Sequence, residues 1–403
     1  MSKLEELIQE LCPDGVEYKP TKDIKIDSFW LMPATPSYID SGVPYITSKN
    51  IRNGCIDFND VKYISEDDYK TISSNRSIQT NDLLITMIGT IGESAFVEDF
   101  IEFYGQNMYL LRLNEQVINR KFYYYYFTSP SVKNTLISKK NASSQGYIKA
   151  GSIESLKVPV PPLEVQREIV RILDNFTELT AELTAELTAR KKQYQHYLNS
   201  FFENQTDNLV PLSSLGTLTR GKRFIHADAT ETGVPCIHYG ELYTFYGVHA
   251  NTVKSHIREE LRPKMRYAHK GDVIIVGAGE NNIDIGVGVA WEGNEDVAVH
   301  DACYTLCHSQ NSKYISYYLR SDMYHNQIKK YVSEGKICSI SATGLGKALI
   351  PLPSITEQER IVDILERFDI LCNDITTGLP AEIEARQKQY EFYRDKLLSF
   401  KQL

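Results

Sequence analysis

The sequence contains no run of apolar residues long enough to cross a membrane, which takes about 20 residues in a row. The N-terminal segment, MSKLEELIQELC, also lacks the apolar stretch of a secretory signal peptide. The seven cysteines are scattered and odd in number, which fits a reducing compartment better than a disulfide framework. We therefore expect a cytoplasmic protein that makes no membrane contact.

Acidic residues are missing from one stretch of a chain that is acidic as a whole. The formal net charge of −8 argues against a protein that coats nucleic acid through bulk positive charge. Residues 116–153 nevertheless contain no Asp or Glu, and their basic residues are Arg120, Lys121, Lys133, Lys139, Lys140 and Lys149. Phosphate binding depends on local charge, so this stretch is compatible with a nucleic-acid site. A solvated, lysine-rich face explains it equally well.

Glycine and proline are absent from residues 163–202, and Pro161 and Pro162 stand just before them. Prolines are tolerated at the start of a helix, so this composition predicts one helix of about 60 Å. Its apolar residues recur with helical spacing, which predicts packing against a partner helix. Residues 355–400 offer that partner, interrupted by Gly378-Leu379-Pro380, where we expect the helix to break. We predict that the two helical regions pair in antiparallel fashion.

The chain also contains an internal duplication, because it aligns with itself after a shift of 192 residues. NRKFYYYYFTSP (119–130) matches NSKYISYYLRSD (311–322), and VPVPPLEVQREIVRILDNF matches LIPLPSITEQERIVDILERF. Further upstream, GVPYITSKNI (42–51) corresponds to GVPCIHYGEL (233–242), and NDLLITMIG (81–89) to GDVIIVGAG (271–279). Each copy is therefore a variable globular part followed by a better-matched helical part.

Local patterns place strands in both globular parts. The segments DLLITMIG, GVGVAWEG and DVAVHDACYTLCH are short, β-branched and bounded by Gly or Asn, which is typical of strands. The run FYYYYF (122–127) favours a buried helix or strand over an exposed platform for stacking bases. We predict an α+β fold, in which two α/β domains from the duplication are joined by two long helices that form an antiparallel coiled-coil spacer.

The predicted central helix carries a tandem repeat, TELTAELTAELTA (177–189). Four residues advance a helix by about 6 Å and about 400°, so each added unit lengthens the helix and roughly keeps its apolar stripe. A spacer of this kind could set the distance between two half-sites on DNA, where a base pair occupies ~3.4 Å. A recent slippage repeat in an ordinary helix explains it as well. The predicted spacer residues are Thr180, Ala181, Glu182, Leu183, Thr184, Ala185, Glu186 and Leu187.

Motifs for nucleotide binding are incomplete. VIIVGAGENN (273–282) resembles a strand that leads into a dinucleotide loop, but Asn282 stands at the third glycine position. SATGLGKA (341–348) has Ser341 and Ala348 where a P-loop needs Gly and then Ser or Thr. We therefore expect neither a dinucleotide nor ATP on this chain.

Motifs for metal chemistry and methyl transfer are also incomplete. PDGVEYK (13–19) packs its carboxylates and lysine too closely to space a pair of metal ions. A second group lacks the additional CxxC of a zinc site, and its members are His300, Asp301, Cys303, Cys307 and His308. No Asn/Asp-Pro-Pro-aromatic motif of adenine methyltransferases is present. We expect no catalytic residue, no metal and no cofactor in this chain.

The matched segments VPVPPLEVQREIVRIL and LIPLPSITEQERIVDIL resemble the paired fingerprint of the DNA-specificity (S) subunits of Type I restriction–modification enzymes. AEIEARQKQYEFYRDKLLSF is similar to their usual C-terminal ending, and PDGVEYKP (13–20) to their usual opening. The Thr-Ala-Glu-Leu block resembles the subclass in which repeat number sets the gap between half-sites. The first copy departs from the pattern, because DSFWLMPATP stands where the second copy has TLTRGKRF (217–224), the common start of a recognition domain.

The resemblance implies an architecture and a set of partners. Two target-recognition domains would each read one half of a split, asymmetric site in double-stranded DNA. Two modification (M) subunits with S-adenosylmethionine and two restriction (R) subunits with ATP and Mg would dock on the chain, which itself catalyses nothing. We expect the first target-recognition domain at 1–155, the central helix at 156–205, the second domain at 206–347 and the C-terminal helical region at 348–403.

Polar loops near the matched segments are candidate DNA contacts, because Arg, Lys, Asn, Gln, Asp and Glu recognise base edges in the major groove. In the first copy the candidates are Lys140, Ser143, Ser144 and Gln145, followed by Lys49, Asn50 and Arg52. In the second copy they are Ser333, Lys336 and Ser339 of the aligned loop, with Arg220, Lys222, Arg223, His238, Tyr239 and Glu241. An exposed polar loop without contact explains each residue about equally well.

Two alternatives to a DNA-specificity subunit remain open. One is a nuclease or methyltransferase with its own active site, which would need one of the incomplete motifs. The other is a structural adaptor whose two lobes bind proteins. Salt-sensitive, sequence-specific DNA binding in the presence of the M partner distinguishes the specificity subunit from the adaptor.

Overall fold

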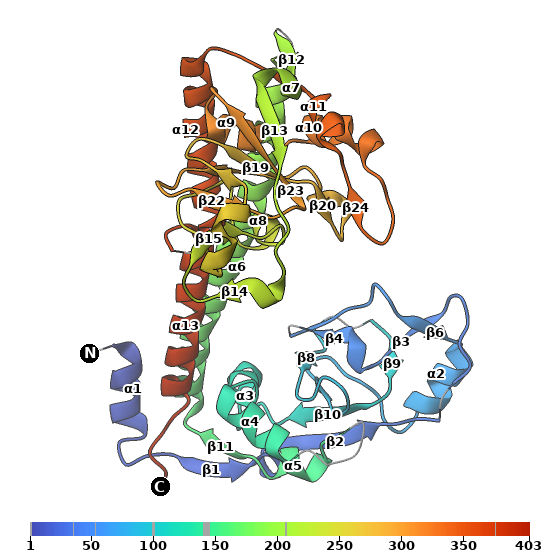
Figure 1. The fold of residues 1–403 in the computed structure, drawn as a ribbon. Coiled ribbons are helices and arrows are strands. Elements are labelled where there is room, and N and C mark those ends of the chain that lie inside the picture. Colours follow the sequence, from blue (N-terminus) through green and yellow to red (C-terminus); the bar gives the residue numbers. More distant parts are fainter. Residues whose placement is uncertain are drawn as a thin grey trace. The chain divides into compact units, whose positions relative to one another are not determined.

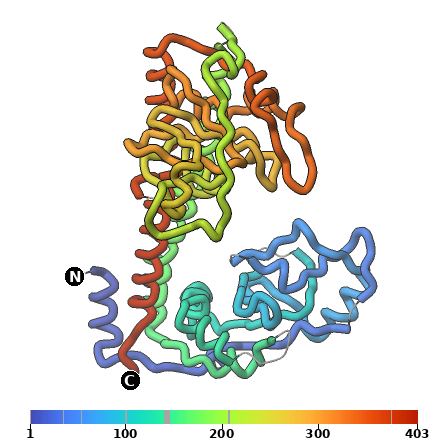
Figure 2. The backbone as a smooth tube through the Cα atoms, viewed as in Figure 1, coloured from blue at the N-terminus to red at the C-terminus, as the bar shows by residue number. Residues whose placement is uncertain are grey.

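A computed structural model describes residues 2–34, 36–52, 54–98, 101–139, 146–205, 208–374 and 376–403. The chain forms two compact units: unit 1 is Met1–Glu182 with Glu384–Leu403, and unit 2 is Leu183–Ile383. The two ends of the chain meet in unit 1, where the Val16 amide donates to Lys401 O at 2.9 Å and the Leu403 amide donates to Val16 O at 3.1 Å (Figures 1 and 2). The C-terminal residues therefore complete the unit that the N-terminal residues begin.

Unit 1 contains a four-stranded antiparallel sheet in the order β2-β10-β7-β8 and a three-stranded sheet in the order β6-β3-β9. Side chains alternate across the first sheet: Leu84 and Leu110 share a core with the second sheet, whereas Leu83 and Leu111 face the helices. The strands are β1 (Glu17–Pro20), β2 (Lys25–Leu31), β3 (Val43–Ile46), β4 (Ile51–Arg52), β5 (Cys55–Ile56), β6 (Lys62–Ile64), β7 (Leu83–Thr86), β8 (Ser94–Phe96), β9 (Tyr104–Gly105), β10 (Met108–Leu113) and β11 (Lys157–Val160). The helices are α1 (Lys3–Leu11), α2 (Glu66–Ser73), α3 (Arg120–Phe127), α4 (Pro130–Ser138) and α5 (Ala150–Glu154).

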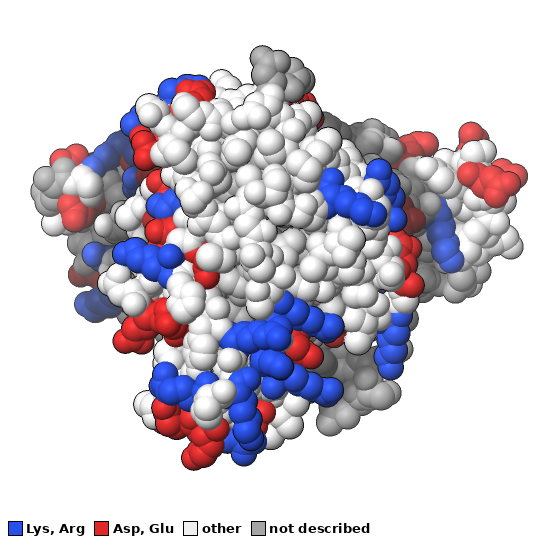
Figure 3. Space-filling view, turned by 45° about the horizontal axis from the view of Figure 1, so that its top comes forward, with Lys and Arg blue, Asp and Glu red and all other residues white. Residues whose placement is uncertain are grey.

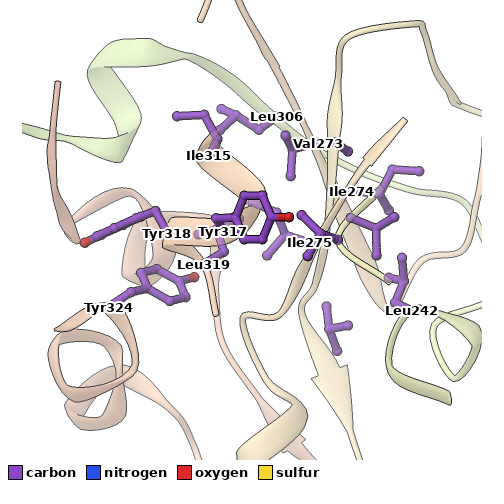
Figure 4. Close-up of a cluster of buried hydrophobic side chains, with 14 of the residues drawn as sticks. Leu242, Val273, Ile274, Ile275, Leu306, Ile315, Tyr317, Tyr318, Leu319 and Tyr324 are labelled. Carbon is purple, nitrogen blue, oxygen red and sulfur yellow. The ribbon is translucent and has the colours of Figure 1, made fainter. Parts of the chain in front are cut away.

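Unit 2 contains two five-stranded sheets, β13-β23-β19-β21-β16 and β14-β17-β15-β22-β18. Figure 4 shows Tyr317 and Tyr318 of α9 and Tyr324 of α10 in the buried cluster that also holds the apolar side chains of β19. The strands are β12 (Leu209–Pro211), β13 (Gly216–Arg220), β14 (Ala229–Thr230), β15 (Val234–Ile237), β16 (His249–Ala250), β17 (Ser255–Ile257), β18 (Tyr267–Ala268), β19 (Val273–Val276), β20 (Ala278–Gly279), β21 (Gly288–Trp291), β22 (Val297–Val299), β23 (Cys303–His308), β24 (Cys338–Ser339) and β25 (Leu349–Pro351). The helices are α7 (Leu212–Leu215), α8 (Glu241–Thr244), α9 (Ser312–Tyr318), α10 (Asp322–Ile328) and α11 (Ala342–Gly346).

The aromatic run FYYYYF (122–127) forms a buried helix, which is one of the two structures that the sequence predicts for it. It lies in α3, which the side chain of Asn119 caps by accepting the amides of Lys121 and Phe122. Phe122 and Tyr123 are fully buried, and the Tyr123 hydroxyl bonds to Thr21 at 3.2 Å. The run therefore belongs to the core of unit 1.

The central helix is continuous, whereas its C-terminal counterpart is broken where the sequence predicted. Helix α6 spans Leu163–Glu203, and the second region consists of α12 (Ile355–Asn373) and α13 (Leu379–Leu397). Gly378 fits the break because a Cβ at this position would lie 2.4 Å from Ile370 O. In the part of the chain that the structure describes, no helix is both long and apolar enough to span a membrane.

Within each unit, a part of α6 packs on the second helical region. In unit 1, Phe176 stacks on Tyr393 with ring centroids 5.6 Å apart. In unit 2, the rings of Tyr197 and Phe368 are 5.2 Å apart, and Tyr194 lines the same cavity as Asn373, further along α12. Since rising numbers in α12 pair with falling numbers in α6, the helices are antiparallel in unit 2.

The best-matched residues of the duplication form the same clamp in both units. The Asn119 amide donates to Gln166 Oε1 at 2.7 Å, and the Asn311 amide donates to Gln358 Oε1 at 3.1 Å. Both glutamines are fully buried, and each donates its Nε2 to the carbonyl of the proline five residues earlier. The matched lysines also pair alike, because Lys121 bonds to Asp174 and Lys313 bonds to Glu366. The fingerprint therefore fixes the start of a long helix to the globular part beside it.

Candidate nucleic-acid interface

The loop after β3 in unit 1 is fixed by Asn50. Its Oδ1 accepts the Thr47 amide at 2.9 Å, and its Nδ2 donates to Asp57 O at 3.0 Å and Asp60 O at 3.1 Å. Only 8% of Asn50 is exposed. The side-chain amide has no free hydrogen-bonding atom left for a base edge. Asn50 therefore positions the loop, whereas the sequence had suggested it as a DNA contact.

Glu241 has the same function in the loop after β15 of unit 2. Its Oε2 accepts the His238 amide at 2.9 Å, and its Oε1 accepts the Ser255 hydroxyl. Glu241 is also 8% exposed. The two loops correspond in the duplicated sequence, so a buried acceptor four residues after the end of the strand recurs in both units. Like Asn50, Glu241 is a positioning residue and not an open base contact.

The neighbours of these two residues remain accessible. In unit 1, Lys49 lies in the 3-10 turn Ser48–Asn50 and Arg52 at the end of β4, and both are exposed. Arg52 donates its Nε to Lys49 O at 2.8 Å, which holds the guanidinium next to the lysine. Exposed lysine and arginine side chains are of the kind that contacts phosphate or guanine.

In unit 2, the structure brings two separated candidate segments together around His300. The rings of His238 and His300 are 4.6 Å apart, and Tyr239 lies 5.6 Å from His300. Phe224 packs edge-on against His300 at 4.9 Å, next to the exposed Arg223. The sequence pattern indicated His300 only as a potential zinc ligand, and His300 is not among the predicted DNA contacts.

Parallel pairing explains why His238 and His300 meet. Strands β15 and β22 are parallel neighbours, with Ile237 opposite Val299. The next residue of each strand therefore emerges at the same edge of the sheet. Both strands read as an apolar run that ends in histidine, VPCIH and VAVH, and this shared ending is the sequence feature that could have identified His300.

The hydrogen bonds of the two imidazoles leave one donor accessible. His300 Nε2 bonds to Phe224 O at 3.2 Å, and its Nδ1 accepts the Ala302 amide at 3.1 Å. His238 Nδ1 accepts the Gly240 amide at 3.4 Å, which leaves Nε2–H of this half-buried ring as a donor. Burial lowers the pKa of both histidines, and the nearby His238 lowers that of His300 further. Burial therefore favours the neutral form of both rings.

Basic residues flank this cluster. Arg220 donates its Nε to Asp301 O at 2.6 Å, and the Lys222 amide donates to Val299 O at 2.9 Å. These bonds fix the main chain, while the side chains of Arg220, Lys222 and Arg223 remain exposed. Figure 3 shows one face of the molecule, on which lysine and arginine side chains gather locally, with Asp and Glu side chains beside them. Local positive charge thus coexists with the acidic total.

The candidates of the loop 333–339 lie on a hairpin. Ser333 and Ser339 pair through two main-chain bonds, of 2.8 Å and 3.1 Å, and Lys336 is exposed at the tip. The Ser339 side chain is half-buried, whereas Ser333 is exposed. The aligned candidates of the first copy, Lys140, Ser143, Ser144 and Gln145, lie outside the described residues.

The incomplete enzyme motifs have structural roles. Ser341 of the P-loop-like segment caps α11 by accepting the Gly344 amide at 3.1 Å. The segment after VIIVG forms β20 and a 3-10 turn, Asn282–Asp284, instead of a long helix. Cys303 is buried while Cys307 is exposed, and the described residues hold no group of three or more potential metal ligands among His, Cys, Asp and Glu.

The duplicated fold and the fingerprint clamps define a two-unit protein of the α+β class, and comparison with known proteins identifies its family. Residues 32–190 and 207–385 each match the family described as "Type I restriction modification DNA specificity domain". Because these matches cover most of the chain, the protein belongs to this family. The predicted family and fold class are confirmed.

Individual relatives agree with this assignment. The chain is 33% identical over 305 residues to the "Type I restriction enzyme EcoR124I/EcoR124II specificity subunit" of Escherichia coli, with 70% of each chain covered. It is 32% identical over 311 residues to a Haemophilus influenzae protein provisionally named a type I restriction enzyme specificity subunit, covering 74% of this chain and 77% of that protein.

Solved structures show the same fold. A chain from a structure of the type I R-M system matches with a TM-score of 0.65 at 17% identity, covering 96% of this chain and 98% of that chain. The HsdS subunit from Thermoanaerobacter tengcongensis matches with a TM-score of 0.53 at 18% identity, covering 96% and 97%.

Proposed function

We propose that this chain is the non-catalytic DNA-specificity subunit of a Type I restriction–modification complex, in which each target-recognition domain reads one half of a bipartite, asymmetric DNA site. The observation that carries the proposal is that the two units share the same buried framework of hydrogen bonds but expose different residues around it. Asn50 and Glu241 fix corresponding loops in the same way, while the exposed neighbours differ between the units. Two readers on one frame suit a site whose halves differ in sequence.

The Thr-Ala-Glu-Leu repeat is the proposed spacer between the two readers. Helix α6 continues through the repeat without a break, and the division between the two units falls inside it, between Glu182 and Leu183. Leu183 and Leu187 are half-buried, whereas Ala181 and Glu186 are exposed. A unit added or removed here would change the helix by about 6 Å and preserve the leucine stripe, which supports the proposed membership of the subclass with a countable spacer.

The proposed partners follow from the same assignment. Two M subunits would methylate adenine with S-adenosylmethionine, and two R subunits would use ATP and Mg, all in the cytoplasm. The chain would supply sequence recognition and the docking scaffold, with its domains at the boundaries 1–155, 156–205, 206–347 and 348–403. The buried, fully paired Gln166 and Gln358 suit a scaffold, because they fix helix and lobe as one body.

A methylation map tests the proposal. The chain is co-expressed with its cognate M subunit in a host without DNA methylation, and N6-methyladenine is located by single-molecule sequencing. A single split motif with one methylated adenine on each strand is the expected result. Unmethylated DNA despite a stable complex with M would contradict the proposal and favour a protein-binding adaptor.

A further inference from the structure

The hairpin 333–339 is anchored at its base in a way that recurs in unit 1. The Ile340 amide donates to Gly277 O at 2.8 Å, and Ser339 pairs with Ala278. In unit 1, the aligned Ile148 amide donates to Met87 O at 3.1 Å, and Tyr147 pairs with Ile88. The two copies therefore anchor Ile148 and Ile340 at corresponding places. The sequence before this anchor differs, with Glu-Gly-Lys-Ile at 334–337 and Ala-Ser-Ser-Gln at the aligned positions 142–145.

The tip of the unit 2 hairpin exposes apolar side chains. Ile337 is 63% exposed, and Ile283 on the neighbouring loop is 84% exposed. Asn282 Nδ2 donates to Glu334 Oε1 at 2.7 Å, which ties the two loops together. Isoleucine is among the residues most often buried, so two exposed isoleucines on joined loops are candidates for a contact that is made in a complex.

A DNA base fits this display better than a protein surface does. Ile283 also lines a cavity with the exposed Phe245 and Ile370, whereas Ile337 does not. One isoleucine is too little for a stable protein interface, which buries about 800 Å² per partner. In the major groove, by contrast, the C5-methyl group of thymine is the apolar group that distinguishes one base pair from another. The exposed Lys336 stands next to Ile337, where it is accessible to a phosphate.

Three charged side chains around the tip already have partners within unit 2. Glu334 accepts a hydrogen bond from Asn282. The Nζ atoms of Lys330 and Lys347 lie 5.1 Å and 5.0 Å from the ring centroid of Tyr331. We propose that Ile337, supported by Ile283 on the joined loop, is a specificity-determining residue that packs against the C5-methyl group of a thymine in the half-site read by unit 2. This inference rests on the proposed function.

Uracil substitution tests the contact, because it removes only the methyl group. The full-length chain is bound to its M subunit, and its Kd is measured for duplexes in which each thymine of the mapped site is replaced singly by uracil. At one thymine we expect the wild-type Kd to rise about fourfold, the value for one methylene-sized group. Ile337→Ala should lose this sensitivity at that thymine alone. Lys336→Ala, the matched control, should weaken binding and keep the uracil effect.

The outcomes separate the inference from the proposed function. Specific binding with no uracil effect at any thymine overturns the inference alone, as does a half-site without thymine or an Ile337→Ala variant that keeps the full uracil effect. Loss of the M subunit from the Ile337→Ala complex in size-exclusion chromatography would assign the tip to a protein contact and also overturn it. If the wild-type complex binds no specific site, the proposed function fails and the inference fails with it.

Discussion

The loop after β3 in unit 1 and the loop after β15 in unit 2 are built alike from different residues. Asn50 and Glu241 each accept the amide three residues earlier, and each is 8% exposed. The loops differ in what they expose, which is Lys49 with Arg52 in one and His238 with Tyr239 in the other. A polar residue with good base-reading chemistry can thus be used up in fixing a loop, and its neighbours then carry the contact.

The largest expected effect concerns the clamp that the two units share. Gln166→Ala and Gln358→Ala should each lower the free energy of unfolding by about 2–3 kcal/mol, because a buried amide loses its acceptor. The two tryptophans lie in different units, Trp30 in β2 and Trp291 in β21. Denaturant unfolding followed by tryptophan fluorescence, in Trp291→Phe or Trp30→Phe backgrounds, therefore reports each unit separately.

The exposed Gln195 on α6 gives the matched control for the clamp. Gln195→Ala should leave both transitions within about 0.5 kcal/mol of the wild type. If Gln166→Ala behaved like this control, the shared clamp would not be a source of stability.

The next effect concerns the two buried acceptors. Asn50→Ala and Glu241→Ala should each cost about 1–2 kcal/mol, because a loop amide loses its partner. Each should also weaken binding to one half-site of the mapped DNA. Glu241→Gln keeps an oxygen for the His238 amide and should cost less than Glu241→Ala. A changed base preference for Asn50→Ala, without loss of stability, would show that Asn50 contacts a base directly.

A smaller effect concerns the exposed basic residues beside the loops. Removing a basic side chain that contacts a phosphate should reduce the slope of log K for DNA binding against log salt concentration by about 1. The variants are Lys222→Ala and Arg223→Ala in unit 2 and Arg52→Ala in unit 1. The slope is measured by titrating the complex with M against the mapped duplex at several salt concentrations. Lys70→Ala, on α2 and paired with Glu66 at 3.6 Å, is the control and should leave the slope unchanged. Equal slopes for every variant would remove these loops from the interface.

The smallest effect distinguishes the units by pH. All nine histidines lie between residues 196 and 325, in unit 2. Burial lowers the pKa of His238, His249, His300, His308 and His325, whereas a hydrogen bond to Asp296 raises that of His269. A lowered folded-state pKa means that the unfolded state binds the proton first, so stability is lost as pH falls below about 6.5. His269 opposes this trend and reduces it.

Fluorescence unfolding at pH 7 and at pH 5.5 measures this difference. In the Trp30→Phe background, Trp291 should report a lower unfolding free energy for unit 2 at the lower pH. In the Trp291→Phe background, Trp30 should report a smaller change, because unit 1 has no histidine. Equal changes in both units would contradict the assignment of the shift to these histidines.

The sequence predicted the repeated frame well because the frame depends on local composition. The absence of glycine and proline from 163–202 indicated α6, and Gly378-Leu379-Pro380 indicated the break that follows α12. The match of Gln166 with Gln358 pointed to a common element, which proved to be a buried clamp. Patterns within a few turns of helix were sufficient for these features.

The candidate interface was harder to predict because it depends on contacts between distant segments. His238 and His300 are brought together by the parallel pairing of β15 and β22, which no local pattern specifies. DVAVHDACYTLCH was expected as strand throughout, yet the chain turns at Asp301 and Ala302 between β22 and β23. Residue type favoured Asn50 and Glu241 as contacts, and only their hydrogen bonds revealed that both are buried supports.

The most direct test of the account is a methylation map of a variant that lacks residues 184–187, one unit of the repeat, beside the map of the wild-type chain. We expect both half-sites to keep their sequence while the gap between them becomes shorter, because about 6 Å of helix is removed. Half-sites that change while the gap stays the same would contradict this expectation.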